Sequence, residues 1–231
     1  MISENYFQNI SLGNLQNTCF IDLPLEVLEQ LQSYKKQILF RKGDILIKQG
    51  LPPASVMFVL SGLVREYIEG PLDKNRNLRI LTSGNFIGLS GLFNDDISNY
   101  SAIAMKDTLV CVINRDYLSK LIRENSEFSF RLVKRYSELE NSFFALLRTN
   151  LYKQMNGKMA DALLYLSSEE FVKENIFEYL SRKDIAEFAS ITTENAIRIL
   201  KSFEKEGIIS LSSKHIEVIN REQLQYISQI G

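Results

Sequence analysis

Two side chains four residues apart, Glu194 and Arg198, have types and spacing that could read the edges of nucleic-acid bases. Residues four apart in a helix lie one turn apart on the same face. An arginine can donate two parallel hydrogen bonds to guanine, and a glutamate can accept one from the exocyclic amine of cytosine. The alternative is a surface ion pair, which stabilises a helix by only about 0.2–0.5 kcal/mol. The elements that hold the two residues decide between these interpretations.

Residues 181–206 have the pattern of two short helices joined by a tight turn. Ser181 and Asp184 have the spacing of a capping box, which predicts a helix that starts near Arg182. Thr192 can cap a second helix. The predicted inner face of that second helix is Ala196, Ile199, Leu200 and Phe203. In a helix-turn-helix of this kind the second helix enters the DNA major groove, so the arrangement favours base contacts over a plain ion pair.

The segment that follows, IISLSSKHIEVI at 208–219, is typical of two strands joined at Ser212-Ser213-Lys214. Helices followed by such a hairpin indicate a winged helix over residues 153–231. This region carries 10 Lys and Arg against 12 Asp and Glu, so attraction to phosphates has to come from local positions. The predicted DNA-contacting residues are Arg182, Lys183, Thr192, Thr193, Glu194, Asn195, Arg198, Lys201 and Lys214.

Residues 38–113 contain short apolar runs interrupted by Gly with Asp, Asn, Ser or Lys beside it. Runs of about five to eight such residues are typical of closely spaced strands with tight turns. The gaps between runs are too short for helical crossovers, so the strands are expected to pair antiparallel. This half of the chain is therefore predicted to be a sandwich or barrel of the jelly-roll kind.

From Asp116 to about Tyr152 the chain has neither Gly nor Pro, and apolar residues recur every three or four positions. This spacing predicts a helix of several turns with one continuous apolar stripe. One interpretation packs the helix wholly on the β core. We favour the other, in which the stripe pairs two copies of the chain, because the face is too long for a small barrel to cover. The predicted dimer interface consists of Val133, Tyr136, Leu139, Phe143, Leu146 and Leu147.

The composition of the 231-residue chain limits the possible functions. Its formal net charge is -1, so nothing global draws it to a polyanion. Cys19 and Cys111 are interpreted as two buried thiols in a reducing compartment, and no signal peptide or membrane span is recognised, which indicates a cytoplasmic protein. With one histidine, no phosphate-binding glycine loop and no metal-ligand spacing, the sequence indicates neither an enzyme nor a metal site.

The order of elements and four motifs resemble the Crp/Fnr superfamily of bacterial transcription regulators. The motifs are KGDILIKQG at 42–50, LSGLVREY at 60–67, SGNFIGLSGLF at 83–93 and SRKDIAEFASITTENAIRILKSFEKEGII at 181–209. The resemblance implies an α+β chain with an N-terminal antiparallel jelly-roll β-barrel, a long dimerisation helix and a C-terminal winged helix-turn-helix domain. The corresponding boundaries are 1–115 for an effector-sensing β-roll with an N-terminal helical segment, 116–152 for the dimerisation helix and 153–231 for the DNA-binding domain. It also implies a homodimer on an inverted repeat of double-stranded DNA, and contact with RNA polymerase if the protein is an activator.

The sequence departs from the family pattern in the turn and in the recognition helix. Thr193 stands where many members have an arginine, and Ser190 stands where glycine is frequent. A residue other than glycine at this position of the turn is expected to add backbone strain of about 1 kcal/mol. A rival interpretation is a ligand-sensing or protein-interaction module whose helix-turn-helix does not bind DNA.

The effector region departs from the family pattern more strongly. Members that bind cyclic AMP have a glutamate and an arginine where this chain has Leu89 and Tyr100, so we expect no response to cyclic AMP. The degenerate pocket is predicted to comprise Gly88, Leu89, Ser90, Tyr100, Ser101, Phe143 and Phe144. With Cys19 alone near the N-terminus, a four-thiolate iron–sulfur cluster cannot form within one subunit. His215 in the predicted wing is interpreted as a solvated hairpin residue or a phosphate contact rather than a haem ligand. No cofactor is expected, and the effector is unknown.

Overall fold

The computed structural model describes residues 35–93, 97–213 and 215–231. Cys19 lies outside the described residues, as do the predicted N-terminal helical segment and Lys214. The chain divides into two compact units, one formed by residues up to 69 together with 79–139, and one formed by 70–78 together with 140–231. Each unit is described by itself.

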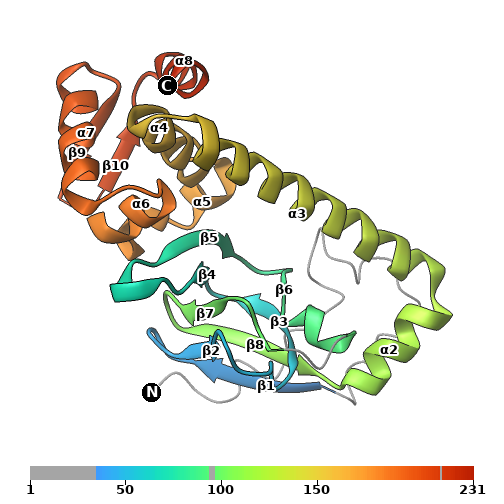
Figure 1. Cartoon of the computed structure of the whole chain (residues 1–231). Coiled ribbons are helices and arrows are strands. Elements are labelled where there is room, and N and C mark those ends of the chain that lie inside the picture. The colour runs from blue at the N-terminus through green and yellow to red at the C-terminus, as the bar shows by residue number, and fades with distance from the viewer. Residues whose placement is uncertain (1–34, 94–96, 214) are drawn as a thin grey trace. The chain divides into compact units, whose positions relative to one another are not determined.

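The first unit is built on two four-stranded sheets (Figure 1). One has the strand order β1-β8-β3-β6 and the other β2-β7-β4-β5. The pairs β1–β8, β3–β8, β3–β6, β2–β7 and β4–β7 are all antiparallel. The predicted antiparallel β domain is confirmed, whereas its closure as a jelly roll stays a prediction.

The strands are β1 (Lys35–Phe40), β2 (Ile45–Ile47), β3 (Val56–Ser61), β4 (Val64–Ile68), β5 (Arg76–Leu81), β6 (Phe86–Ile87), β7 (Ser101–Ala104) and β8 (Thr108–Ile113). Two short 3-10 helices interrupt them, η3 (Pro71–Asp73) and η4 (Leu89–Leu92).

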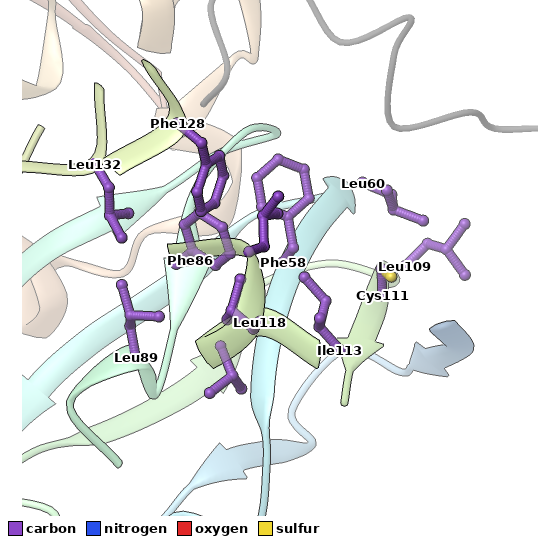
Figure 2. Close-up of a cluster of buried hydrophobic side chains, with 12 residues drawn as sticks. Phe58, Leu60, Phe86, Leu89, Leu109, Cys111, Ile113, Leu118, Phe128 and Leu132 are labelled. Carbon is purple, nitrogen blue, oxygen red and sulfur yellow. The ribbon is translucent and has the colours of Figure 1, made fainter. Parts of the chain in front are cut away.

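Two buried clusters fill the first unit. One cluster joins β3, β6 and β8 to the helices that follow, through Phe58, Phe86, Leu118, Phe128 and Leu132 among others (Figure 2). The other includes Ile47, Val64, Leu81, Ala102 and Val110. Burial of such side chains contributes about 1.5–3 kcal/mol each, so these clusters account for much of the stability of the β domain. Cys111 is buried in the first cluster, as expected, and its thiol donates to the backbone carbonyl oxygen of Val112 at 3.9 Å.

The single helix expected over 116–152 is wrong, because the chain forms two helices there. They are α2 (Arg115–Glu124) and α3 (Ser126–Tyr152). Asn125 separates them with an extended backbone, and its Oδ1 accepts a hydrogen bond from the backbone N–H of Phe128 at 2.8 Å. An asparagine that satisfies an orphan N–H in this way caps a new helix instead of continuing the old one. Leu118 and Phe128 can therefore both reach the same core cluster.

The second unit holds the end of α3, the helices α4 (Met155–Leu166), α5 (Glu169–Lys173), η5 (Ile176–Tyr179), α6 (Arg182–Phe188), α7 (Thr193–Lys205) and α8 (Arg221–Ile230), and the strands β9 (Ile209–Ser212) and β10 (His215–Val218). The predicted helices and hairpin are confirmed. Helix α8 was not predicted.

Asp161 on α4 ties three helices of the second unit together. Its carboxylate accepts hydrogen bonds from Thr149 at 2.6 Å, from Lys153 at 2.8 Å and from Ser228 on α8 at 2.5 Å. Charge-assisted hydrogen bonds of this kind are stronger than neutral ones. They anchor the C-terminal helix α8 beside α4, the helix that supports the helix-turn-helix. None of the helices in the described ranges is long and apolar enough to cross a membrane.

Candidate nucleic-acid interface and effector region

Helix α6 begins at the predicted capping box. The Asp184 carboxylate accepts from the backbone N–H of Ser181 at 2.7 Å, and the Ser181 hydroxyl accepts from the backbone N–H of Asp184 at 3.1 Å. Two N–H groups that the helix leaves without intrahelical partners are thus satisfied reciprocally. Ile185 and Ala186 are buried, which seats α6 on the unit's core.

The turn between α6 and α7 is closed by backbone hydrogen bonds around Ser190. The N–H of Ser190 donates to the carbonyl of Glu187 at 3.3 Å, and the N–H of Ile191 donates to the carbonyl of Ala186 at 3.0 Å. Ser190 adopts the left-handed conformation with φ of 54°. The expectation of a glycine-type turn with a serine in it is confirmed, and this conformation costs about 1 kcal/mol.

Helix α7 is fixed at its start and along its inner face. The Thr192 hydroxyl accepts from the backbone N–H of Asn195 at 3.3 Å, which confirms the predicted cap. The four residues of the predicted inner face are all buried, namely Ala196, Ile199, Leu200 and Phe203. Because this face is packed and the first turn is capped, the opposite face of α7 is held in one orientation.

Glu194 and Arg198 lie exposed on that opposite face. The Arg198 guanidinium donates to the side-chain oxygen of Asn195 at 3.4 Å. Within the described part of the chain, no ion pair joins Arg198 to Glu194. Hydrogen bonds from its own backbone N–H and from the Thr192 hydroxyl hold the pKa of Glu194 below its usual value, so the carboxylate is ionised at neutral pH.

The other predicted DNA contacts differ in their surroundings. Lys201 is exposed, and Thr193 and Asn195 are half-buried at the start of α7. The Lys183 ammonium is exposed and lies 3.8 Å from the Glu187 carboxylate. Arg182 is half-buried, and its guanidinium donates to the carbonyl oxygen of Ser213 at 3.2 Å.

Strands β9 and β10 form the predicted hairpin, in which Ser212 is paired with His215 and Ile209 with Val218. His215 is exposed, and its ring meets the Phe177 ring edge-on with the centroids 6.3 Å apart. This ring contact lies at the turn end of the hairpin, where His215 pairs with Ser212.

In the first unit the predicted effector residues Gly88 and Tyr100 contact each other. Gly88 is left-handed with φ of 74°, and its backbone N–H donates to the Tyr100 hydroxyl at 3.1 Å. Leu89, in contrast, is buried in the first core cluster (Figure 2). Ser90 is exposed. Burial raises the pKa of Tyr100 well above its ordinary value, so the phenol stays protonated and neutral.

The hydroxyl of Ser101 is engaged by neighbours on both sides. It donates to the Glu69 carboxylate at 2.5 Å and accepts from the backbone N–H of Gln49 at 2.9 Å. Hydrogen bonds from Lys48 and then from Ser101 hold the pKa of Glu69 below its usual value. The Glu69 carboxylate is ion-paired with the Lys48 ammonium at 2.7 Å, and the Ser101 hydroxyl proton is already donated to that carboxylate rather than available to a phosphate.

A buried ion pair in the same β domain was missed at the level of sequence. Glu66 on β4 is only 2% exposed, and the Arg79 guanidinium on β5 lies 2.5 Å from its Oε2. Among the described side chains, the other oxygen, Oε1, has no hydrogen-bond partner. Burial raises the pKa of Glu66 above its ordinary value of 4.5, while Arg79 acts in the opposite direction. The sequence signal for this burial is that Glu66 lies two residues after Val64 on the same strand, so both side chains point to the same, inward face.

Phe143 and Phe144, the remaining predicted pocket residues, lie on α3 in the second unit with exposures of 39% and 60%. Their role in an effector pocket stays a prediction.

The predicted dimer stripe on α3 is largely uncovered within one chain. Val133, Phe143 and Leu147 are 67%, 39% and 54% exposed, and Tyr136 is also exposed. Leu139 and Leu146 are half-buried. Among the described residues of the first unit, Phe128 and Leu132 in the first turns of the helix pack in the core cluster. The stripe as an interface between two copies stays a prediction that this exposure motivates.

In comparison with known proteins, each half of the chain matches the model of a protein family. Residues 37–125 match the family model of a cyclic nucleotide-binding domain, and residues 157–227 match that of a Crp-like helix-turn-helix domain. The chain belongs to the Crp/Fnr family of transcription regulators. The resemblance seen in the four sequence motifs is thereby confirmed.

Relatives of this Crp/Fnr chain extend over most of its length. The anaerobic regulatory protein of Bacillus subtilis (strain 168) is 26% identical over 191 residues, which cover 80% of this chain and 79% of the relative. The transcriptional activator protein Anr of Pseudomonas aeruginosa is 25% identical over 214 residues, which cover 88% and 85%.

A crystal structure of a regulator assigned to the same family from Eubacterium rectale superimposes on the chain with a TM-score of 0.70. The two are 18% identical, and the match covers 90% of this chain and 96% of the other. At this identity the similarity shows the fold alone. It confirms the arrangement of an N-terminal β domain followed by a C-terminal helix-turn-helix region.

Proposed function

We propose that this Crp/Fnr chain acts as a homodimer that binds an inverted repeat of double-stranded DNA and regulates transcription in the bacterial cytoplasm. The observation that carries the proposal is the outward face of α7, which presents Glu194 and Arg198 on a capped and packed helix. Both side chains match the hydrogen-bonding pattern of a G·C pair in the major groove.

The orientation of α7 supports base reading over a surface ion pair. Arg198 is held by Asn195 rather than by Glu194, so both charged tips remain exposed and available. Lys201, one turn further along, supplies a positive charge for phosphate contact. The second unit as a whole has no excess of positive charge, so affinity for arbitrary sequences should be modest and base contacts should dominate recognition.

Dimerisation supplies the second recognition helix. The exposed apolar stripe on α3 would be buried between two copies, and each fully buried large apolar side chain contributes about 1.5–3 kcal/mol. Two-fold symmetry then places the recognition helices in successive major grooves, about 34–36 Å apart. RNA polymerase is a further partner if this protein is an activator. The Anr relative is named a transcriptional activator.

Regulation by cyclic AMP is not part of the proposal. The Gly88 N–H is bonded to a neutral tyrosine, Ser101 is bonded to a carboxylate and Leu89 is in the core. A phosphate would therefore meet no cation from these positions and would lose its hydration without compensation. The effector, if there is one, has a different chemistry.

Selection from a random DNA pool with the purified full chain tests the proposal. We expect an enriched inverted repeat with half-sites about one helical turn apart and a G·C pair fixed in each. The matched control is the double variant E194A/R198A, which should lose that enrichment while it keeps the wild-type circular dichroism and melting temperature. A pool without enrichment would instead support a module whose helix-turn-helix does not bind DNA.

A further inference from the structure

The start of α6 and the turn of the β9–β10 hairpin are joined by Arg182. Its Nη2 donates to the carbonyl oxygen of Ser213 at 3.2 Å. Ser213 has the left-handed backbone conformation with φ of 48°, which is costly for a residue other than glycine. The guanidinium thus satisfies a carbonyl at the strained point of the turn.

The end of α7 is joined to the same hairpin by Glu204. Its Oε1 accepts from the backbone N–H of Leu211 on β9 at 3.3 Å. The Glu204 carboxylate also attracts the Arg182 guanidinium, which opposes the lowering of the pKa of Arg182 by partial burial. Two opposite charges therefore lie near each other, and each holds a backbone group of the hairpin.

We propose that Arg182 and Glu204 are positioning residues that fix the wing relative to the recognition helix, so that the wing can reach the DNA backbone. This inference rests on the proposed function. It gives Arg182 a role that needs no direct DNA contact, because one N–H of its half-buried guanidinium is bound to Ser213.

If Glu204 positions the wing, its removal should change DNA affinity in the opposite direction from the effect of its charge alone. An acidic group near DNA repels phosphates, so its removal should strengthen binding if nothing else changes. If Glu204 holds the wing, its removal instead frees Leu211 and weakens binding. The sign of the effect therefore separates the two roles.

DNA titrations of the full-length protein on its selected site test the inference. We expect E204A to weaken binding roughly fivefold, the value of one hydrogen bond. E204Q keeps an acceptor oxygen for Leu211 and should stay close to wild type. R182A should also weaken binding, and R182A/E204A should be less impaired than the product of the two single effects.

The salt dependence of binding distinguishes wing positioning from general destabilisation. Loss of a phosphate contact made by the wing should reduce the slope of log K against log salt by about 0.9 in E204A, although that variant removes an acid. A variant that was merely less stable would melt earlier with an unchanged slope. An E204A protein that binds more tightly, or with the wild-type slope, would overturn the proposal.

Amide hydrogen exchange without DNA separates this inference from the proposed function. In E204A, peptides covering 208–219 should exchange faster, while peptides from α4 and α8 should not change. Unchanged exchange in the hairpin would overturn the proposal that Glu204 fixes the wing, even if the wild type binds DNA. If the hairpin exchanges faster in E204A but the wild type selects no DNA, Glu204 holds the wing as a structural link. Only the DNA-binding proposal would then be overturned.

Discussion

The backbone N–H of Gly88 donates a hydrogen bond to the hydroxyl oxygen of Tyr100 at 3.1 Å. A left-handed glycine with a free N–H is the kind of group that cradles a phosphate. Here the donor is already satisfied by a neutral phenol, and the nearby Ser101 hydroxyl donates to Glu69. We therefore predict that cyclic AMP does not bind at physiological concentrations.

Isothermal titration of the full chain with cyclic AMP checks this first prediction. The expected result is no saturable heat at micromolar ligand. The control variant Y100F releases the Gly88 N–H without adding a cation and should also fail to bind. A dissociation constant in the micromolar range for the wild type would show that the pocket is not degenerate.

The second prediction concerns the buried Glu66. Its pKa is raised in the folded protein, so between pH 4.5 and the folded pKa the folded state holds a proton that the unfolded chain has released. The contribution of this group to the free energy of unfolding is then fully present below pH 4.5 and decreases as pH rises through the folded pKa.

The variant E66Q should remove this contribution, so its free energy of unfolding should fall less steeply as pH rises. Urea unfolding of both proteins between about pH 4 and pH 8 measures it, with the exposed-site variant E124Q as the control. Because Arg79 would face a neutral amide in E66Q, the absolute stability is expected to shift as well. The test therefore compares the slopes of the free energy of unfolding against pH. Identical slopes for wild type and E66Q would contradict the assignment.

The third prediction is that S190G stabilises the protein by about 1 kcal/mol, because glycine adopts the left-handed conformation without a steric cost. The greater freedom of glycine in the unfolded chain reduces the gain. S190A keeps the Cβ and should not stabilise. Chemical denaturation compares the three proteins, and a gain in S190A equal to that in S190G would show that the φ of 54° is not the cause.

The fourth prediction concerns the α3 stripe. A charge introduced by F143E or L147E would be buried between two apolar faces, so both variants should dissociate the dimer. Sedimentation velocity at micromolar protein checks the mass. N141E adds the same charge at an exposed polar position of α3 and should remain dimeric. Dimers that persist in both stripe variants would place the interface elsewhere.

The helix-turn-helix could be predicted from sequence because its signals are local. Ser181 and Asp184 reveal the start of one helix, Thr192 caps the next, and the spacing of the inner face identifies the buried residues. Each signal depends on residues within one or two turns. The structure reproduces them because packing and local preference agree.

The missed features depend on partners far away in the sequence or on a weak local signal. Glu66 is paired with Arg79 across strands, and α8 is held by the contact of Ser228 with Asp161 on α4. The hydrogen bond between Arg182 and Ser213 spans 31 positions, so no local pattern indicates it. The break at Asn125 had a local signal, an asparagine before Ser126, but the apolar period continued across it and obscured the cap.

On the recognition helix, we expect Arg198 to read a base and Lys201 to contact a phosphate. Competition binding of R198A and K201A against the selected site, single-base variants of it and random DNA measures both roles. We predict that R198A loses about 1–3 kcal/mol of discrimination at one G·C pair per half-site, whereas K201A weakens binding to all sequences alike. An equal loss for both variants on every sequence would contradict the account.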